Sequence, residues 1–419
     1  MPRWESAQTH GTKATFFYGY VVVSAACIIM VATWGAFYSF GIFFKPILTD
    51  FGWTRAMTAG AFSLATIIQG IVAIPVGRLT DRYGSRMVIT LCGFLLGLGY
   101  LLMSHTNSIW QLYLFYGVIM GISMGGYFVS LVSTTARWFV KRRGLMTGIV
   151  VAGIGLGAII VPPLANWLIS SYDWRMSYRI MGGTVLVIVV LAAQFLRRKP
   201  DQVGQTLAGQ EEIQEPESTL PNGKVSFKMA IRTKQLWMAC AMFFCFGFCL
   251  FSIMVHIAPH ATDLEISPVN AASILSIIGI SSIVGKVGMG HVTDRIGSRL
   301  SWVIGFIIMA IALFWLTVAG EVWMFYAFAI IFGFAYGGCV SAEAPLIAEL
   351  FGLSSHGVLL GLGSFIFTIG AAIGPLLAGY IYDVSSTYQQ AFLICGMVSI
   401  LGLILTVLLK PISSNQVEN

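Results

Sequence analysis

Lys286 carries the charge in this chain that most needs a chemical explanation. It lies in the stretch Ile274–Met289, whose other residues carry no formal charge. In a lipid-spanning helix a lysine at that depth costs about 2.5–3.5 kcal/mol, so it needs a cavity, a partner or a ligand. Helical spacing places Ser282 one turn away on the same face, among small residues. Such a face suits an anion, which an ammonium group binds by a charge-assisted hydrogen bond, although small residues also serve close helix packing.

Tyrosines and other aromatic residues in further apolar segments are candidates for the rest of such a site. Tyr127 and Tyr336 are the best hydroxyl donors, each on a stripe of small and polar residues. Trp34 and Tyr38 stand one turn apart, and Phe251 ends another aromatic stripe, so these rings could form an apolar wall round a short alkyl chain. Aromatic stripes at helical spacing also arise from ordinary packing, and the sequence leaves both interpretations open.

Two titratable residues in apolar segments are candidates for carrying a proton. Glu343 lies two residues before Pro345, and burial of a carboxyl group there would favour its protonated form. It could instead be a structural partner of the charged loops around Asp81 or Asp294, and we favour this structural interpretation. His256 lies near the end of another segment, where an imidazole can exchange a proton near neutral pH or serve as an interfacial polar residue.

The elements that must position these residues are membrane-spanning helices. Of the 419 residues, 57% are hydrophobic and 10% are charged, whereas soluble domains are about 45–50% apolar and about 25% charged. About 20 apolar residues span a bilayer as a helix. We expect an all-α membrane protein with twelve spans, at about 16–44, 55–80, 86–104, 109–137, 143–171, 175–196, 232–260, 268–291, 299–318, 322–350, 355–382 and 388–409.

The basic residues predict how the spans are oriented. With both termini and the central polar segment on one side, that side holds most of the 24 lysines and arginines, and the other side holds Lys45, Arg55, Arg175 and Arg179. The positive-inside rule makes the rich side cytoplasmic, with both termini. Short outer loops without a glycosylation acceptor fit a bacterial inner membrane. The net charge of +7 then reflects topology and the lipid bilayer, and no basic domain offers a site for nucleic acid.

A duplicated motif shows that the chain consists of two related halves. GRLTDRYGSR at Gly77–Arg86 matches GHVTDRIGSR at Gly290–Arg299, and the same shift of 213 residues relates Gly144 to Gly357. Two halves in one membrane orientation are parallel repeats about an axis along the membrane normal. The shift pairs Lys286 with Ala73, so shared packing cannot require this charge.

The domain boundaries follow from the repeat and from composition. A polar stretch rich in proline and glycine separates the two sets of six apolar segments. Such composition is typical of a linker. We predict an N-terminal six-helix bundle at 1–197, a cytoplasmic linker at 198–231 and a C-terminal six-helix bundle at 232–419.

The repeated loop resembles the signature of the major facilitator superfamily, over essentially the whole chain. The resemblance implies the major facilitator fold, with spans 1, 4, 7 and 10 around a central path, and loops that gate the cytoplasmic opening. Glycine permits close helix approach, and aspartate can cap a helix end and face arginines. The implied gating residues are Gly77, Asp81, Arg82 and Arg86 in the first copy and Gly290, Asp294, Arg295 and Arg299 in the second.

A narrower resemblance is carried by WGAFYSFGIFFKPI at Trp34–Ile47, DFGWTRA at Asp50–Ala56 and ARWFVKRRGLMTGIVVAGIGLG at Ala136–Gly157. These segments look like those of monocarboxylate transporters, and the related oxalate/formate exchangers share the layout. In both groups a basic residue in the eighth span anchors the substrate, and Lys286 occupies that place. The usual residue there is arginine, whose planar fork lysine lacks.

We therefore expect a secondary transporter of small monocarboxylates such as lactate or pyruvate, in symport with a proton and by alternating access, functioning as a monomer. A carboxylate exchanger of the oxalate/formate type and a broad-specificity efflux carrier are the alternatives. The exchangers that this chain resembles use a second cation in the eleventh span, and this chain has none there. No nucleophile–base pair and no cysteine–histidine metal spacing stands out, so we expect no enzymatic activity, metal or cofactor.

Overall fold

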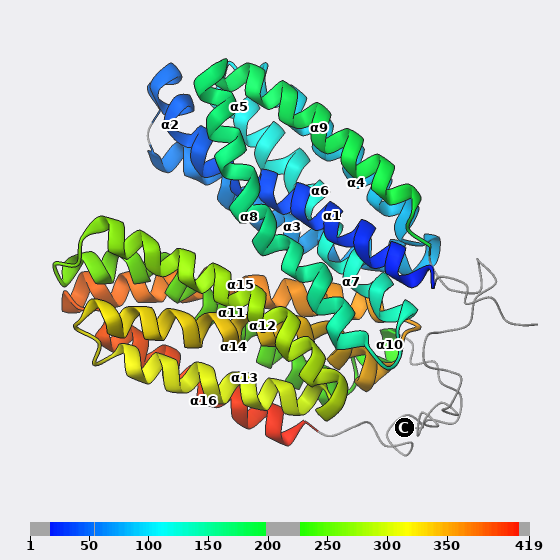
Figure 1. Cartoon of the computed structure of the whole chain (residues 1–419), viewed down its shortest axis with the longest axis vertical. Helices are drawn as coiled ribbons and strands as arrows, with labels where there is room; N and C mark the ends of the chain where they lie inside the picture. The colour runs from blue at the N-terminus through cyan, green and yellow to red at the C-terminus, as the bar shows by residue number, and fades with distance from the viewer. Residues whose placement is uncertain (1–16, 54, 198–226, 410–419) are drawn as a thin grey trace, which may run out of the picture.

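Twelve helices that are long and apolar enough to cross a membrane make up most of the structure (Figure 1). The computed structural model describes residues 17–53, 55–197 and 227–409. Most of the predicted linker lies outside these residues, and its last part contains the short helix α10 (Phe227–Ala230). The prediction of an all-α membrane protein with twelve spans is confirmed.

The helices of the N-terminal half follow the predicted segments closely, with two breaks. The first span consists of α1 and the start of α2, and the fourth span consists of four short pieces. The elements are α1 (Gly19–Tyr38), α2 (Phe40–Phe51), α3 (Arg55–Tyr83), α4 (Ser85–Met103), α5 (Ile109–Leu112), η1 (Tyr113–Met120), α6 (Gly121–Met124), α7 (Tyr127–Trp138), α8 (Arg143–Ser171) and α9 (Trp174–Gln194).

The fourth span departs from a regular α-helix for a reason that its residues show. Element η1 is a π-helix, and a break at Gly125 and Gly126 separates α6 from α7. A Cβ atom at Gly121 would lie 2.8 Å from the carbonyl oxygen of Ala65, and one at Gly125 would lie 2.9 Å from that of Gln69. The glycines therefore let this span press against the α3 backbone, and the helix adjusts its winding there.

The C-terminal half consists of long helices without such breaks. They are α11 (Lys234–Asp263), α12 (Pro268–Ile296), α13 (Ser298–Leu316), α14 (Val322–Phe351), α15 (His356–Ser385) and α16 (Gln389–Leu408). The start of α12 shows why the boundaries were predictable. Ser267 caps the helix by accepting a hydrogen bond from the Asn270 N–H at 3.3 Å, and Pro268 occupies the first turn, where its missing N–H costs nothing.

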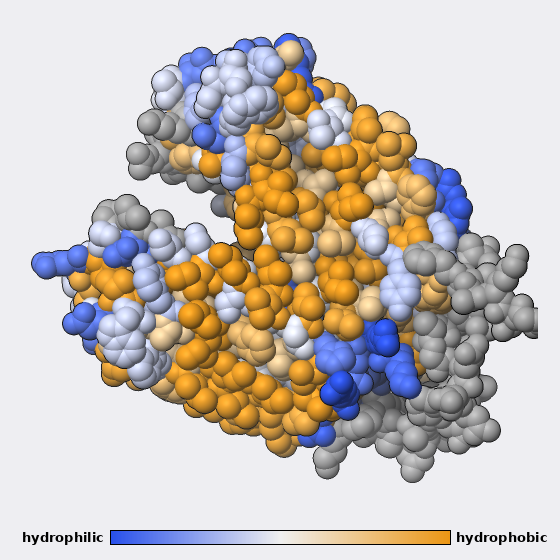
Figure 2. Space-filling view, viewed as in Figure 1, coloured by the Kyte–Doolittle hydropathy of each residue, from blue (hydrophilic) through white to orange (hydrophobic). Residues whose placement is uncertain are grey.

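The two halves lie side by side and meet most closely at one end. Helices α3 and α8 of the first half pack on α15 and α12 of the second. We call this the linker end, because α10, at the end of the predicted linker, lies there (Figure 1). At the opposite end the halves diverge, and Figure 2 shows a cleft entering between them. Apolar side chains cover most of the outer surface in this view, as lipid contact requires.

Candidate functional site

A cavity of about 390 Å³ lies between the two halves and is lined by both. Its walls come from α1, α3, α6, α7 and α8 on one side and from α11, α12, α14 and α15 on the other. Cavities that hold small organic ligands fall in the range of about 300–1,000 Å³ and are mostly apolar with a few placed polar groups. The composition of this wall fits that description, since aromatic and aliphatic residues surround a small polar set.

Lys286 is the basic residue among those that line the cavity. Its side chain is 1% exposed, and its Nζ lies 5.0 Å from the centroid of the Tyr336 ring, a cation–π contact. Among the described residues, no hydrogen bond or ion pair to its ammonium group is found. A buried ammonium group with a ring as its neighbour and no ion pair has the chemistry to bind an anion.

Small residues on neighbouring helices fix the position of Lys286. A Cβ atom at Gly148 would overlap the Lys286 carbonyl oxygen, and one at Gly337 would overlap that of Ser282. Helices α8 and α14 therefore clamp the α12 backbone on two sides. The small residues beneath Lys286 have a different role, because a Cβ atom at Gly279 would meet nothing within 4 Å and both Gly279 and Ser282 line the cavity.

Five of the other predicted ligand-contacting residues also line the cavity: Ser282, Tyr336, Tyr38, Trp34 and Phe251. The Ser282 hydroxyl donates to the Gly279 carbonyl oxygen at 2.7 Å and keeps its lone pairs for another donor. The Trp34 indole nitrogen is buried and has no hydrogen-bond partner among the described residues. An indole N–H can only donate, so this group is suited to an acceptor on a ligand.

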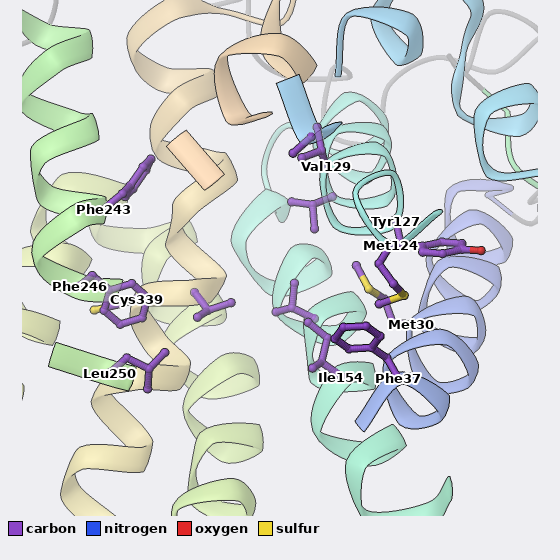
Figure 3. Packing of buried hydrophobic residues seen from close by; sticks show 14 of the residues in the cluster. Met30, Phe37, Met124, Tyr127, Val129, Ile154, Phe243, Phe246, Leu250 and Cys339 are labelled. Carbon is purple, nitrogen blue, oxygen red and sulfur yellow. The ribbon is translucent and has the colours of Figure 1, made fainter. Parts of the chain in front are cut away.

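Tyr127 lies outside the cavity, which corrects the expectation that it faces a ligand. It is fully buried, and its hydroxyl lies 3.4 Å from the Ser123 Oγ, which donates to the Cys92 carbonyl oxygen at 2.6 Å. Figure 3 shows Tyr127 beside Met124 within the first half. Tyr127 stays on the same face as Ser123, and this face packs against α4 of the same half and does not meet the cavity.

The two candidate proton carriers differ in their position relative to the cavity. Glu343 lines the cavity and is 7% exposed, with no ion pair among the described residues, which counts against its expected pairing with the charged loops. His256 lies outside the cavity lining, between α11, α15 and α16. Its Nε2 is 2.9 Å from the Pro375 carbonyl oxygen and its Nδ1 is 3.2 Å from the Tyr388 hydroxyl. These contacts give His256 a packing role.

The structure also adds polar lining residues that the sequence did not indicate. They are Gln69 on α3 and Ser364 and Thr368 on α15. The Ser364 hydroxyl is buried without a partner among the described residues. A signal for Gln69 existed, because the 213-residue shift pairs it with Ser282. Ser364 and Thr368 lie in an apolar, glycine-rich helix, where nothing in the local pattern distinguishes cavity from packing faces.

At the linker end two aspartates join the halves in a reciprocal arrangement, which we call the paired aspartate contacts. Asp81 accepts hydrogen bonds from the N–H groups of Gly357 at 3.0 Å and Val358 at 3.1 Å, at the start of α15. Asp294 accepts from Gly144 and from Leu145, the latter at 2.9 Å, at the start of α8. Each carboxylate thus caps the N-terminus of a helix in the other half, where the helix dipole favours negative charge.

The motif glycines make these contacts possible. A Cβ atom at Gly77 would overlap the Gly357 carbonyl oxygen, and one at Gly290 would lie 2.6 Å from that of Gly144. Asp81 also pairs with Arg137, a residue that was not predicted.

The other predicted gating residues, all arginines, face elsewhere. Arg86 donates to Gln194, Arg299 donates to carbonyl oxygens at the end of α16, and Arg82 lies over the ring of Tyr83. Arg295 is exposed at the end of α12. Among the predicted gating residues, the glycines and aspartates of the motif therefore make the contact between the halves.

Twelve spans in two repeated halves, with a cavity between them and a closed contact at one end, are the architecture of a membrane transporter. The model of the Major Facilitator Superfamily matches residues 25–291 and 257–419, and the chain belongs to this family.

Known proteins of this family resemble the chain over most of its length. It is 26% identical to the bovine monocarboxylate transporter 13 over 92% of this chain and 88% of that protein. It is also 26% identical to the Escherichia coli transporter YhjX, described as uncharacterized, over 78% of this chain and 81% of that protein. Among solved structures, FucP in its outward conformation gives a TM-score of 0.72 at 16% identity, covering 94% of this chain and 100% of FucP. The proton:xylose symporter XylE gives 0.75 at 15% identity, covering 96% and 98%.

Proposed function

We propose that this transporter carries small monocarboxylates, such as lactate or pyruvate, together with a proton. The observation that carries the proposal is the buried Lys286 ammonium, which lines the cavity without an ion pair among the described residues. A carboxylate bound there forms a charge-assisted hydrogen bond and neutralises the site. The relatives named monocarboxylate transporters support the same substrate class.

The rest of the cavity suits a short organic acid. The Trp34 indole N–H and the Ser282 hydroxyl, whose lone pairs can accept a hydrogen bond from a ligand, come from different halves, and Phe251 and Tyr336 supply apolar surface. Lysine binds as a point charge, so orientation of the ligand depends on these neighbours more than it would with arginine. We therefore expect a preference for acids with a small alkyl group and one further acceptor.

Proton coupling is assigned to Glu343, because it is the acidic residue among those that line the cavity. An anion on Lys286 leaves a nearly neutral pair, whereas the empty carrier keeps a bare ammonium group. With Glu343 ionised the empty cavity is again neutral, and with Glu343 protonated the loaded cavity is neutral. Alternation between these two states requires one proton for each monocarboxylate, and it limits the charge that has to be occluded.

The gating role is assigned to the paired aspartate contacts. Opening the linker end requires that Asp81 and Asp294 both release the helix N-termini of the opposite half. The state described here, closed at the linker end with a cleft at the other, is one side of the alternating-access cycle. With the linker in the cytoplasm, as the basic residues predict, this state faces outward.

An uptake assay in proteoliposomes tests this proposal. Vesicles in a weakly buffered medium are supplied with lactate, pyruvate, oxalate or a cationic dye molecule, and the external pH is recorded with an electrode. We expect lactate or pyruvate uptake accompanied by external alkalinisation, and loss of the alkalinisation in Glu343→Gln while lactate–lactate exchange persists. Strict exchange of oxalate for formate without proton movement would favour the anion exchanger, and transport of the cationic compound alone would favour the efflux carrier.

A further inference from the structure

A groove that borders exposed apolar residues of the first half lies at its linker end, between α4 and α9. Its volume is about 710 Å³, and its lining includes Ser85, Arg86, Leu91 and Phe94 from α4 and Arg197 just after α9. We propose that this groove binds an anionic phospholipid, with the phosphate at the arginines and an acyl chain along α4. The site is separate from the central cavity, so it does not depend on which solute is transported.

The polar end of the groove is built for an anion. The Arg86 Nε donates to the Gln194 Oε1 at 2.9 Å, and because the amide is neutral this contact positions the guanidinium group without cancelling its charge. Arg197 has no ion pair among the described residues. The Ser85 hydroxyl is buried without a hydrogen-bond partner in the same part of the chain, and Ser85 is 1% exposed.

The start of α4 adds to this electropositive surface. Gly84 precedes the helix with φ of +88° and provides no side-chain cap, so the first N–H groups of a 19-residue helix are left without one. Helix N-termini carry a partial positive charge and bind phosphate groups. Basic pockets between spans at the cytoplasmic surface are recognised sites for acidic lipid headgroups.

The apolar end of the groove identifies the ligand as a lipid. Met87, Leu91 and Phe94 follow Arg86 along α4 and are 62%, 57% and 54% exposed. With a rise of about 1.5 Å per residue, Phe94 lies roughly 12 Å deeper along the helix than Arg86. A soluble phosphate has no use for this surface, whereas an acyl chain that continues from a bound headgroup would cover it.

At the equivalent position of the second half, protein groups alone supply the hydrogen-bond partners. At the start of α13, the Ser298 hydroxyl donates to the Glu349 carboxylate at 2.7 Å, and the Ser298 N–H also points to it. Arg299 donates to the carbonyl oxygens of Thr406 and Val407. The residue of the first half that is equivalent to Glu349 is Ala136, which has no acceptor in its side chain. The first half therefore lacks the built-in anion that the second half supplies.

Native mass spectrometry of the purified full chain tests the proposal. The protein in detergent is titrated with phosphatidylglycerol or with phosphatidylcholine of identical acyl chains, and bound lipids are counted. We expect phosphatidylglycerol to bind more tightly, with a loss of about 5-fold in Arg86→Gln or Arg197→Gln and roughly 30-fold in the double variant. Ser85→Ala should weaken binding as well. The matched control Arg299→Gln, at the equivalent corner of the second half, should bind phosphatidylglycerol like the unmodified protein.

Two results would overturn the proposal. One is equal binding of the two lipids, or unchanged phosphatidylglycerol binding in both single arginine variants, which stay informative if the double variant does not fold. The other is complete displacement of phosphatidylglycerol by millimolar inorganic phosphate, which would assign the groove to a soluble anion. Retained lipid binding in the presence of phosphate supports the assignment.

Discussion

Positions 73 and 286 are equivalent in the two halves, and both line the central cavity, yet alanine stands at one and lysine at the other. The same contrast recurs nearby. Ser130 lies within hydrogen-bond distance of Thr80, with 2.6 Å between their hydroxyl oxygens, whereas its counterpart Glu343 lines the cavity. The second half thus supplies both formal charges of the cavity lining, and the first half supplies Trp34, Tyr38 and Gln69.

At the linker end, in contrast to the cavity, equivalent positions of the two halves make equivalent contacts. Asp81 and Asp294 make the same contacts in reciprocal directions, and the glycine pairs behind them are reciprocal too. Features that both copies retain therefore belong to the shared architecture and its closure. We attribute the cavity charges that one copy holds alone to the ligand, because packing that was duplicated with the backbone cannot explain them.

The largest effect is expected from moving the charge between the halves. Lys286→Ala removes the anchor and should lower kcat/KM for lactate uptake about 100-fold, the upper part of the range for a hydrogen bond to a charged group. Ala73→Lys combined with Lys286→Ala returns a cation to the cavity on the opposite wall, away from Ser282 and Tyr336. We expect this double variant to stay at least about tenfold below the unmodified protein in the same assay.

Lys286→Arg is the control for charge and should keep measurable uptake with an altered preference among short acids. Recovery of normal lactate uptake in the double variant Ala73→Lys with Lys286→Ala would contradict the assigned difference between the two halves, because the location of the cation would then not matter. Full activity of Lys286→Ala would remove the carboxylate anchor altogether.

The next largest effect concerns closure of the linker end. Asp294→Asn should raise the population open at that end about tenfold, since hydrogen bonds to a charged group are worth about 1.5–3 kcal/mol. Asp81→Asn should have a greater effect, because it also loses the Arg137 ion pair. Distances between spin labels on α3 and α15 would report the shift. Identical distance distributions in both variants and the unmodified protein would show that other contacts hold this end closed.

The sequence predicted most of this architecture because lipid imposes strict rules. Apolar segments of fixed length gave the helix bounds, so that α8 matches the predicted 143–171 at both ends. The repeat and the isolated charge located Lys286, and helical spacing added Ser282 and Tyr336. The prediction failed for Tyr127, because helical spacing shows which residues share a face, as Ser123 and Tyr127 do, but not whether that face meets the cavity or a neighbouring helix.

Other parts of the site could not be read from one chain. Phe246 and Phe367 line the cavity, yet their segments look the same whether a face meets lipid, another helix or a ligand. The pairing of Asp81 with α15 joins residues more than 270 positions apart. Local patterns indicate that an aspartate caps a helix, but which helix depends on the packing of the two halves.

A smaller effect is expected at the ring that faces the lysine. Tyr336→Phe keeps the cation–π contact with Lys286 and should change lactate affinity less than about 3-fold, whereas Tyr336→Leu should weaken it about 5-fold. Binding measured by scintillation proximity with labelled lactate separates affinity from transport rate. Equal losses in the two variants would mean that the hydroxyl, and not the ring, is the group that matters.

The smallest effect is expected at Tyr127, the tyrosine of the first half that lies outside the cavity. Its hydroxyl has a long 3.4 Å contact with Ser123, and Ser123 has its own acceptor in the Cys92 carbonyl oxygen. Tyr127→Phe should therefore leave lactate uptake within about 2-fold of normal and cost about 1 kcal/mol or less in stability, the value of one hydrogen bond. Uptake kinetics and thermal unfolding in detergent measure the two quantities. A tenfold loss of uptake with unchanged unfolding would place Tyr127 at the ligand, and the two halves would then share the polar contacts that we assign mainly to the second.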